Sequence, residues 1–171
     1  MKKVLGALAS FSAVLLLAAC GGSSAPSKTD NQALVQNTTA AAQGSGAFGA
    51  ALATTDGAAF TLSTPASFTP GHFASGQLPG QTYVAFNISV TPKVDLNLSA
   101  MTVTATTPSG ACADILDGDN AIQGAPPTAI PAGTTTSFKW ALSCPGKSGD
   151  ALTVLLSNNN VSLVQALGKL A

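Results

Sequence analysis

A two-residue hydrophobic period runs through the second half of the chain and restricts its fold more than any other feature. Every second residue of segment 84–91 is large and apolar, namely Val84, Phe86, Ile88 and Val90. The residues between them are small or polar. Because successive side chains of a β-strand point to opposite faces, this spacing predicts a strand with one buried face.

The same alternation predicts four further strands. Their apolar positions are Phe60 and Leu62, then Met101, Val103 and Ala105, then Phe138, Trp140 and Leu142, and finally Leu152, Val154 and Leu156. Turn-forming pairs such as Asp56-Gly57 and Pro145-Gly146 separate the runs. Short strands with turn-rich connections predict an all-β antiparallel β-sandwich. The tail 161–170 fits a last strand or a short amphipathic helix, and we favour the strand.

The N-terminus has the pattern of a bacterial lipoprotein signal peptide. Lys2 and Lys3 precede an uncharged apolar stretch, 4–17, that is too short for a spanning helix. The stretch ends in Leu-Ala-Ala followed by Cys20, which matches the lipobox. We expect cleavage before Cys20, with diacylglyceryl lipid on its thiol, so that the protein is held outside the cytoplasm on the cell membrane or an outer membrane.

Composition divides the chain into three parts. Residues 1–19 are the expected signal peptide, and the Gly-, Ser- and Ala-rich segment 20–55 is expected to be a lipidated flexible tether. Residues 56–171 are expected to form the sandwich domain. After cleavage the chain has five Lys, seven Asp and no Arg or Glu, a net charge of −2. So few cations argue against nucleic-acid binding, which needs clustered Lys or Arg.

Three cysteines are present, and lipidation of Cys20 leaves Cys112 and Cys144. Two cysteines in an oxidising compartment can pair in one way, so we expect a Cys112–Cys144 disulfide, with two separate buried thiols as the alternative. In the chain-entropy view, closing a loop of this length stabilises the fold by roughly 3–4 kcal/mol.

Three stretches suggest a family. They are Leu-Ser-Thr-Pro at 62–65, Gly-Gln-Thr-Tyr-Val-Ala-Phe-Asn-Ile-Ser-Val-Thr at 80–91, and Ile-Pro-Ala-Gly at 130–133. Over roughly residues 57–157 the chain resembles bacterial extracellular immunoglobulin-like domains. These are lipoprotein-borne domains of unknown function, related in fold to a mycobacterial secreted immunoprotective antigen. The resemblance implies an immunoglobulin-like sandwich and no catalytic residues. The chain departs from it at Pro92-Lys93-Val94, where the family often has an Asn-led polar turn.

Few residues suggest catalysis. His72 is the one histidine, and no Gly-x-Ser-x-Gly motif is present to expose a nucleophilic serine. A Ser-His-Asp site would have to use His72. The simpler interpretation is that His72 is a surface-loop residue. We therefore expect no enzyme and no cofactor, with a cell-envelope hydrolase that uses His72 as the alternative.

An acidic cluster offers a second candidate site. Its members are Asp114, Asp117, Asp119 and Asn120. Oxygen ligands beside a glycine can bind calcium, but the cluster lacks the EF-hand spacing and its terminal Glu. A solvated turn is the simpler interpretation, since Asp and Asn favour turns for local reasons. Zinc is disfavoured, because one histidine and a disulfide cannot supply four ligands.

A non-catalytic module that binds a partner or serves in the envelope is thus the favoured function. The best place for contacts is the glycine-rich segment 68–79, with Phe68, His72 and Phe73. The alternative is that these aromatic residues only cover the end of the sandwich. An unidentified protein or small ligand is the expected partner.

The lipobox leads to the first prediction. Protein purified from its native membrane should have the mass of residues 20–171 plus acyl groups, and its other two cysteines should be alkylated only after reduction. Intact mass spectrometry with and without reductant measures both. An unlipidated mass would contradict the assignment of Cys20, and thiols free without reductant would contradict the disulfide.

Overall fold

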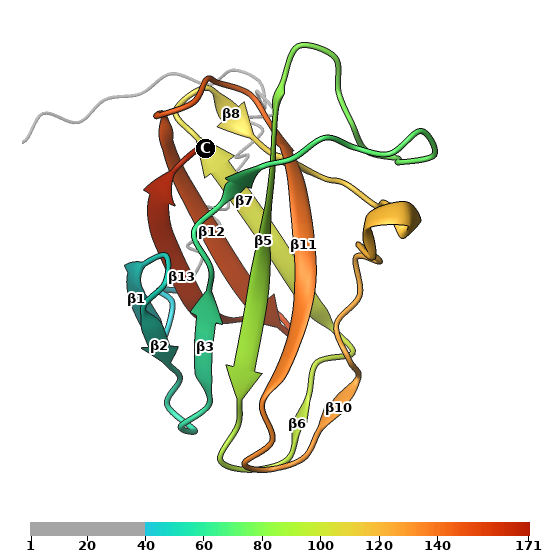
Figure 1. Cartoon of the computed structure of the whole chain (residues 1–171). Coiled ribbons are helices and arrows are strands. Elements are labelled where there is room, and N and C mark those ends of the chain that lie inside the picture. Colours follow the sequence, from blue (N-terminus) through green and yellow to red (C-terminus); the bar gives the residue numbers. More distant parts are fainter. Residues whose placement is uncertain (1–39) are drawn as a thin grey trace, which may run out of the picture. The chain divides into compact units, whose positions relative to one another are not determined.

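Residues 40–171 form two β-sheets packed face to face in the computed structural model of the chain (Figure 1). The expected signal peptide, Cys20 and the tether up to residue 39 lie outside these described residues. The first sheet has the order β1 (Gly44–Ala47), β13 (Val161–Lys169), β12 (Ala151–Asn158), β7 (Met101–Thr107) and β8 (Gly110–Ala111). No helix in the described part is long and apolar enough to cross a bilayer.

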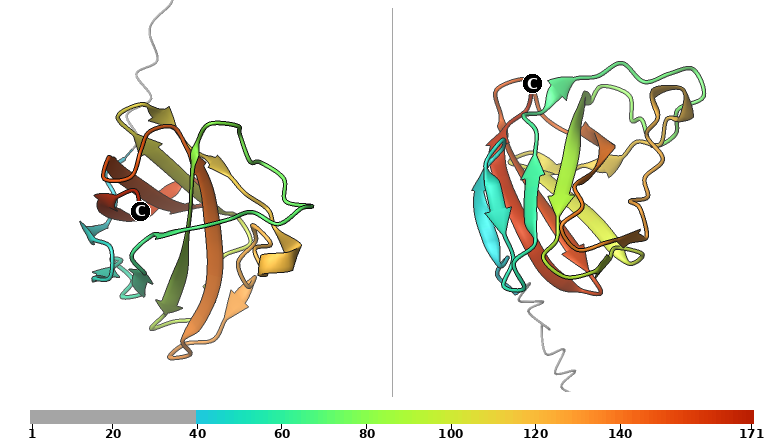
Figure 2. Two further views of the ribbon diagram at one scale, coloured as in Figure 1. Left: turned by 45° about the horizontal axis from the view of Figure 1, so that its top comes forward. Right: turned by 60° about the horizontal axis from the view of Figure 1, so that its bottom comes forward.

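The second sheet faces the first across the core (Figure 2). Its order is β2 (Ala51–Ala53), β3 (Ala59–Leu62), β5 (Thr82–Thr91), β11 (Thr136–Cys144) and β9 (Ala113–Asp114), with β4 (Ala66–Ser67) paired beside β5. The orders β3-β5-β11-β9 and β7-β12-β13 follow the A-B-E-D and C-F-G sheets of an immunoglobulin-like sandwich. The predicted fold class is therefore confirmed. One described pair departs from the antiparallel pattern, because β1 runs parallel to β13.

The alternating apolar residues fill the space between the sheets, as their period predicts. Phe60, Ile88 and Leu156 have no exposed surface, and Trp140 is 4% exposed. The tail, left open between strand and helix, is the strand β13, whose Val164 and Ala166 are fully buried. The buried side chains stand at every second position, which is the period of a strand and not of a helix.

The expected end of the tether at residue 55 is corrected by the structure, because β1 and β2 belong to the two sheets. Small residues permit this arrangement. A Cβ atom on Gly44 would lie 2.6 Å from the carbonyl oxygen of Ala53, so only glycine lets β1 approach β2 this closely. The composition that suggests a flexible tether is here the composition of a tightly packed edge.

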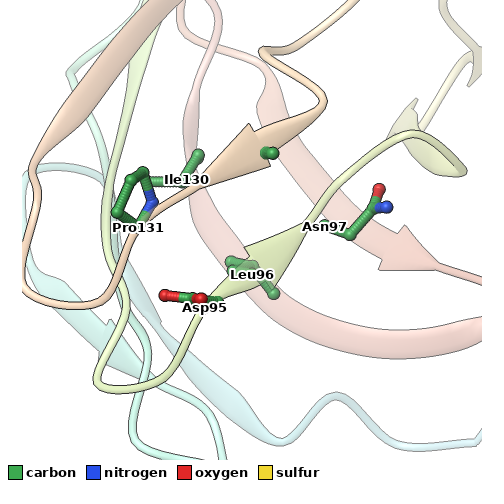
Figure 3. Close-up of a pocket in the computed structure, with 6 residues that line it drawn as sticks. Asp95, Leu96, Asn97, Ile130 and Pro131 are labelled. Carbon is green, nitrogen blue, oxygen red and sulfur yellow. The ribbon is translucent and has the colours of Figure 1, made fainter.

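A small separate pair of strands lies at the end of the sandwich where β5 finishes. β6 (Leu96–Asn97) pairs with β10 (Ala129–Ile130) beside a hollow of about 210 Å³ (Figure 3). Leu96, Ile130 and Pro131 give the hollow an apolar lining. The carboxylate of Asp95 at its rim accepts a hydrogen bond from the N–H of Ala132 (2.9 Å). This bond joins the connection between β5 and β6 to the residues that follow β10.

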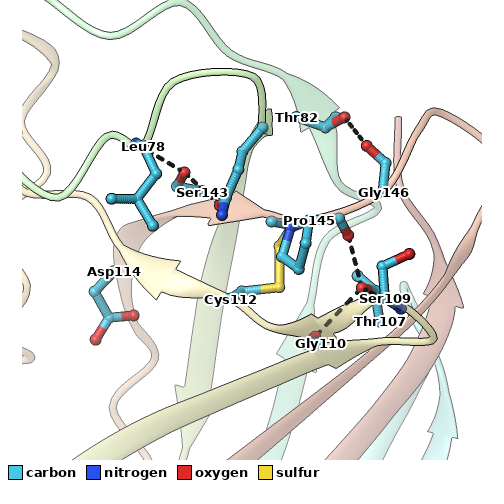
Figure 4. The surroundings of a disulfide bond; sticks show 12 residues. Leu78, Thr82, Thr107, Ser109, Gly110, Cys112, Asp114, Ser143, Pro145 and Gly146 are labelled. Carbon is cyan, nitrogen blue, oxygen red and sulfur yellow. Dashed lines mark hydrogen bonds between the residues drawn. A yellow bond between two sulfur atoms is a disulfide. The ribbon is translucent and has the colours of Figure 1, made fainter.

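The predicted Cys112–Cys144 disulfide is present and joins the β8–β9 connection to the end of β11 (Figure 4). Cys144 is fully buried and its side chain belongs to the main core. Two hydroxyl groups hold the turn that follows: Thr82 Oγ1 donates to the carbonyl of Gly146 (2.8 Å), and Thr107 Oγ1 donates to that of Pro145 (2.6 Å). Both sheets are thus fastened at this end.

Removal of the disulfide should lower stability without changing the fold. The bond spans 32 residues, so the variant with Cys112→Ala and Cys144→Ala should lose about 3–4 kcal/mol of unfolding free energy. Urea denaturation of both proteins measures the difference. Addition of reductant should destabilise the parent chain and leave the variant unaffected. Equal midpoints for the two proteins would show that the bond does not stabilise the domain.

Candidate functional site

The outer face of the second sheet carries a second, smaller hydrophobic cluster. Ala141 on β11 points away from the main core, and yet it has no exposed surface. Ile115 and Ile122, each 1% exposed, cover it together with half-buried Phe68 and Tyr83. These covering residues come from two loops and from the start of β5. The loops are therefore packed on the sheet and not free in solvent.

The two loops are also joined to each other, and we call segments 68–81 and 115–122 together the two-loop platform (Figures 1 and 2). Ser75 and Leu116 exchange two backbone hydrogen bonds, of 2.9 and 3.0 Å. Gly76 follows with φ of +84°, and a Cβ atom there would lie 1.9 Å from the carbonyl oxygen of Asp114. Glycine is thus required where the two loops meet.

Ser143 ties the far end of segment 68–81 to the sheet. Its hydroxyl is fully buried, donates to Gln81 Oε1 (2.8 Å) and accepts from the N–H of Leu78 (3.2 Å). The Tyr83 hydroxyl donates to the carbonyl of Leu78 (2.8 Å). Both backbone groups of Leu78 are therefore satisfied by side chains of the sheet, which fixes the loop in one position.

Asp117 fixes the first part of segment 68–81, at Gly71. It precedes the single turn of 3₁₀-helix η1 (Gly118–Asn120), and its Oδ1 caps that turn by accepting from the N–H of Asn120 (3.3 Å). Its Oδ2 accepts from the N–H of Gly71 (2.7 Å) and from Nδ2 of Asn120 (2.8 Å). Asp117 is 1% exposed because the neighbouring loop shields it, although it lies outside the main core. The Gly71 bond joins loops 46 residues apart in sequence.

Two carboxylates of the acidic cluster, those of Asp114 and Asp117, are engaged in hydrogen bonds. Hydrogen bonds from Gly71 and then from Asn120 lower the pKa of Asp117. Partial burial raises the pKa of Asp114, an effect reduced by the hydrogen bond from Trp140 Nε1 (2.8 Å). Within residues 40–171 no three His, Cys, Asp or Glu side chains are grouped so that they could hold a metal ion. The carboxylates of Asp114 and Asp117 thus serve N–H donors.

His72 is exposed, and its ring meets the ring of Phe73 edge-on, with centroids 4.7 Å apart. In the described part of the chain, no hydrogen bond or ion pair joins His72 to a carboxylate. The nearby Asp117 carboxylate already accepts three hydrogen bonds. The relay that the hydrolase alternative requires is therefore not assembled in this structure.

The three residues of the expected binding loop have different roles. Phe68 is half-buried and anchors the platform on the small cluster. Phe73 is 84% exposed, the largest exposed fraction among the big apolar side chains of the described residues. Leu78 and Leu116, at 44% and 46%, are also exposed on the platform. Leu116 was missed in the sequence, because only the bridge to Ser75 brings it beside the predicted loop.

Comparisons with known proteins give a fold and no family. No family model matches the sequence, and no curated protein is significantly similar to it. Among solved structures, the candidate lipoprotein ycdA of Bacillus subtilis is 14% identical with a TM-score of 0.52, over 67% of this chain and 37% of that one. The secreted protein MPT63 of Mycobacterium tuberculosis is 19% identical with a TM-score of 0.49, over 72% and 96%. An uncharacterized β-sandwich protein of Clostridium difficile is 13% identical with a TM-score of 0.45, over 75% and 95%.

Replacement of Asp117 by Asn should loosen the platform and leave the sandwich intact, because an amide offers one acceptor oxygen where the carboxylate uses two. The amide of Gly71 should exchange with solvent about tenfold faster or more. In the parent chain the hydrogen bonds to the Asp117 carboxylate lower its pKa below the ordinary value of 3.8. The stabilisation of the platform by this carboxylate is therefore fully present above pH 3.8 and is lost as the pH falls through the folded-state pKa.

Hydrogen exchange followed by NMR at several pH values measures the effect, and Asp119→Asn is the control with the same charge change. Unchanged exchange at Gly71 in the Asp117 variant would show that the bond does not hold the loop.

Proposed function

We propose that this protein is a lipid-anchored, extracytoplasmic binding module without catalytic activity, and that its two-loop platform contacts a partner protein. The observation that carries the proposal is Phe73. Its side chain is 84% exposed on a loop whose backbone is fixed at Gly71, Ser75 and Leu78. An exposed aromatic ring on an ordered loop loses little conformational entropy when it binds.

Location outside the cytoplasm is supported by two independent features of the chain. The lipobox ending in Cys20 is the pattern for export and lipidation. The Cys112–Cys144 disulfide is typical of oxidising compartments, and its burial against the core is that of a structural bond. Together they favour a mature chain that begins at Cys20 and is anchored to a membrane by lipid.

A protein partner fits the chemistry of the platform. Phe73, Leu78 and Leu116 are apolar, while the polar side chains of His72, Gln77 and Asp119 are exposed on the same two loops. Apolar anchors with a polar surround are the usual composition of interfaces in which a few residues supply most of the affinity. We therefore expect Phe73 to enter an apolar pocket of the partner.

The contacts of His72 and Asp117, the residues that the hydrolase alternative would use, support a non-catalytic role. His72 contacts Phe73, and Asp117 accepts backbone and amide N–H groups. Neither group is placed to activate a nucleophile.

The test places a photo-crosslinking amino acid at residue 73 of the full chain in its native cells. We expect a specific crosslinked protein, and we expect Phe73→Ser in a chain labelled at Leu116 to reduce the yield at least tenfold. Labelling at Val94, 58% exposed and on the connection that follows β5, is the control. The same products from positions 73 and 94 would rule out a specific role of the platform.

A further inference from the structure

The edge of β11 is paired along only part of its length. On one side β11 pairs with β5 from Thr136 to Cys144. On the other side β9 pairs with Leu142 and Ser143 alone. The stretch from Thr136 to Lys139 therefore has no neighbouring strand on that side, within the described residues.

The backbone groups that face this open edge can be identified from their neighbours. The carbonyl of Ala141 accepts from the N–H of Ile115 (2.9 Å), so the backbone of Ala141 faces away from β5. Asn87, the register partner of Lys139, turns its carbonyl to the N–H of Ser63 (2.9 Å) and not to β11. By the two-residue period, the N–H and C=O groups of Lys139 and Ser137 face the open edge.

These four groups have no hydrogen-bond partner among residues 40–171. The segment that passes beside them, 121–127, contains Pro126 and Pro127, which have no N–H to donate. Segment 121–127 and the edge of β11 both border a hollow of about 420 Å³. Its lining residues are Ala121, Gln123, Ala125, Pro126, Pro127, Ser137, Phe138 and Lys139. The edge is thus unpaired and accessible.

Charge indicates what could occupy the hollow. Lys139 is its one charged lining residue, and no acidic side chain lines it. The ammonium group donates to the carbonyl of Asn120 (3.2 Å), which leaves two of its three hydrogens for another acceptor. Among the described residues no carboxylate forms an ion pair with it. A ligand with a carboxylate would therefore gain a charge-assisted hydrogen bond here.

We propose that the open edge of β11 is a strand-addition site for an extended acidic peptide segment of a partner protein. The peptide pairs with the backbone of Ser137 and Lys139, and its acidic side chain reaches the ammonium group of Lys139. Main-chain bonds of this kind give affinity, and the side-chain contact gives selectivity. The site adjoins the two-loop platform, because Ala121 lines its hollow and Lys139 binds the carbonyl of Asn120. It does not use the exposed Phe73, Leu78 or Leu116, so it goes beyond the function proposed above. The competing explanation is that Lys139 and the two prolines only protect an edge from pairing.

The test uses the full-length chain in detergent and two five-residue peptides with blocked ends, Thr-Val-Asp-Val-Thr and Thr-Val-Lys-Val-Thr. We expect the Asp peptide, at millimolar concentration, to slow hydrogen exchange at the amides of Ser137 and Lys139, and to change the fluorescence of Trp140, the residue that follows Lys139. The Lys peptide and an N-methylated Asp peptide should bind at least tenfold more weakly.

Variants separate the alternatives. Lys139→Glu should reverse the preference between the two peptides, whereas Lys147→Glu, the same charge change in an exposed turn, and Phe73→Ser should leave it unaltered. Three results would overturn the proposal. Neither peptide binds, the peptide protects amides outside β11 from exchange, or the Lys139→Glu variant binds the Asp peptide as tightly as the parent chain does. Protection without peptide that disappears when residues 21–39 are deleted would also overturn it, because the occupant would then be the chain's own tether.

Discussion

The antiparallel pairing of β5 with β11 is the interaction on which the rest of the structure depends. Its register runs without a break from Thr136–Val90 to Cys144–Thr82. On the inner face these strands bury Phe86, Ile88 and Leu142 in the main core, and on the outer face Ala141 supports the small cluster beneath the platform. The disulfide begins at the last residue of the same strand. One pair of strands thus holds the sandwich together and serves as the base for both surfaces that we propose to be functional.

The platform shows how a long loop can be ordered without regular secondary structure. Between β4 and β5 the chain runs fourteen residues, 68–81, and fixing so many backbone angles is costly. The cost is offset at separate points: Asp117 binds Gly71, Leu116 pairs with Ser75, and Ser143 and Tyr83 bind Leu78. Each contact satisfies backbone groups that would otherwise need water. The exposed ring of Phe73 lies between the first and second of these points, where the backbone is held on both sides.

The sequence predicts what depends on neighbours along the chain and misses what depends on distant ones. Alternation around Ile88, Trp140 and Val154 identifies the central strands, and the absence of other thiols after lipidation identifies the disulfide. The first two strands escape detection because the glycines and alanines that allow their close packing also resemble a flexible linker. Asp117 can be recognised as a turn residue, but its bond to Gly71 depends on how two loops fold over the sheet. For the same reason the burial of Ala141 and Ser143, and the open edge at Lys139, have no local signal.

The parallel pairing of β1 with β13 determines how the domain would respond to mechanical tension. β1 lies near the N-terminal end of the described chain, and four consecutive residues, from Gly44 to Ala47, are in register with Val164 to Leu167. The side chain of Gln43, just before β1, accepts two hydrogen bonds from Thr55, of 2.7 and 2.8 Å. A pull on the N-terminal side acts along β1 and therefore across the hydrogen bonds of the ladder, which must yield together and cannot open one by one. In a protein held at its N-terminus, this geometry would let the sandwich stay folded while force acts on the rest of the domain.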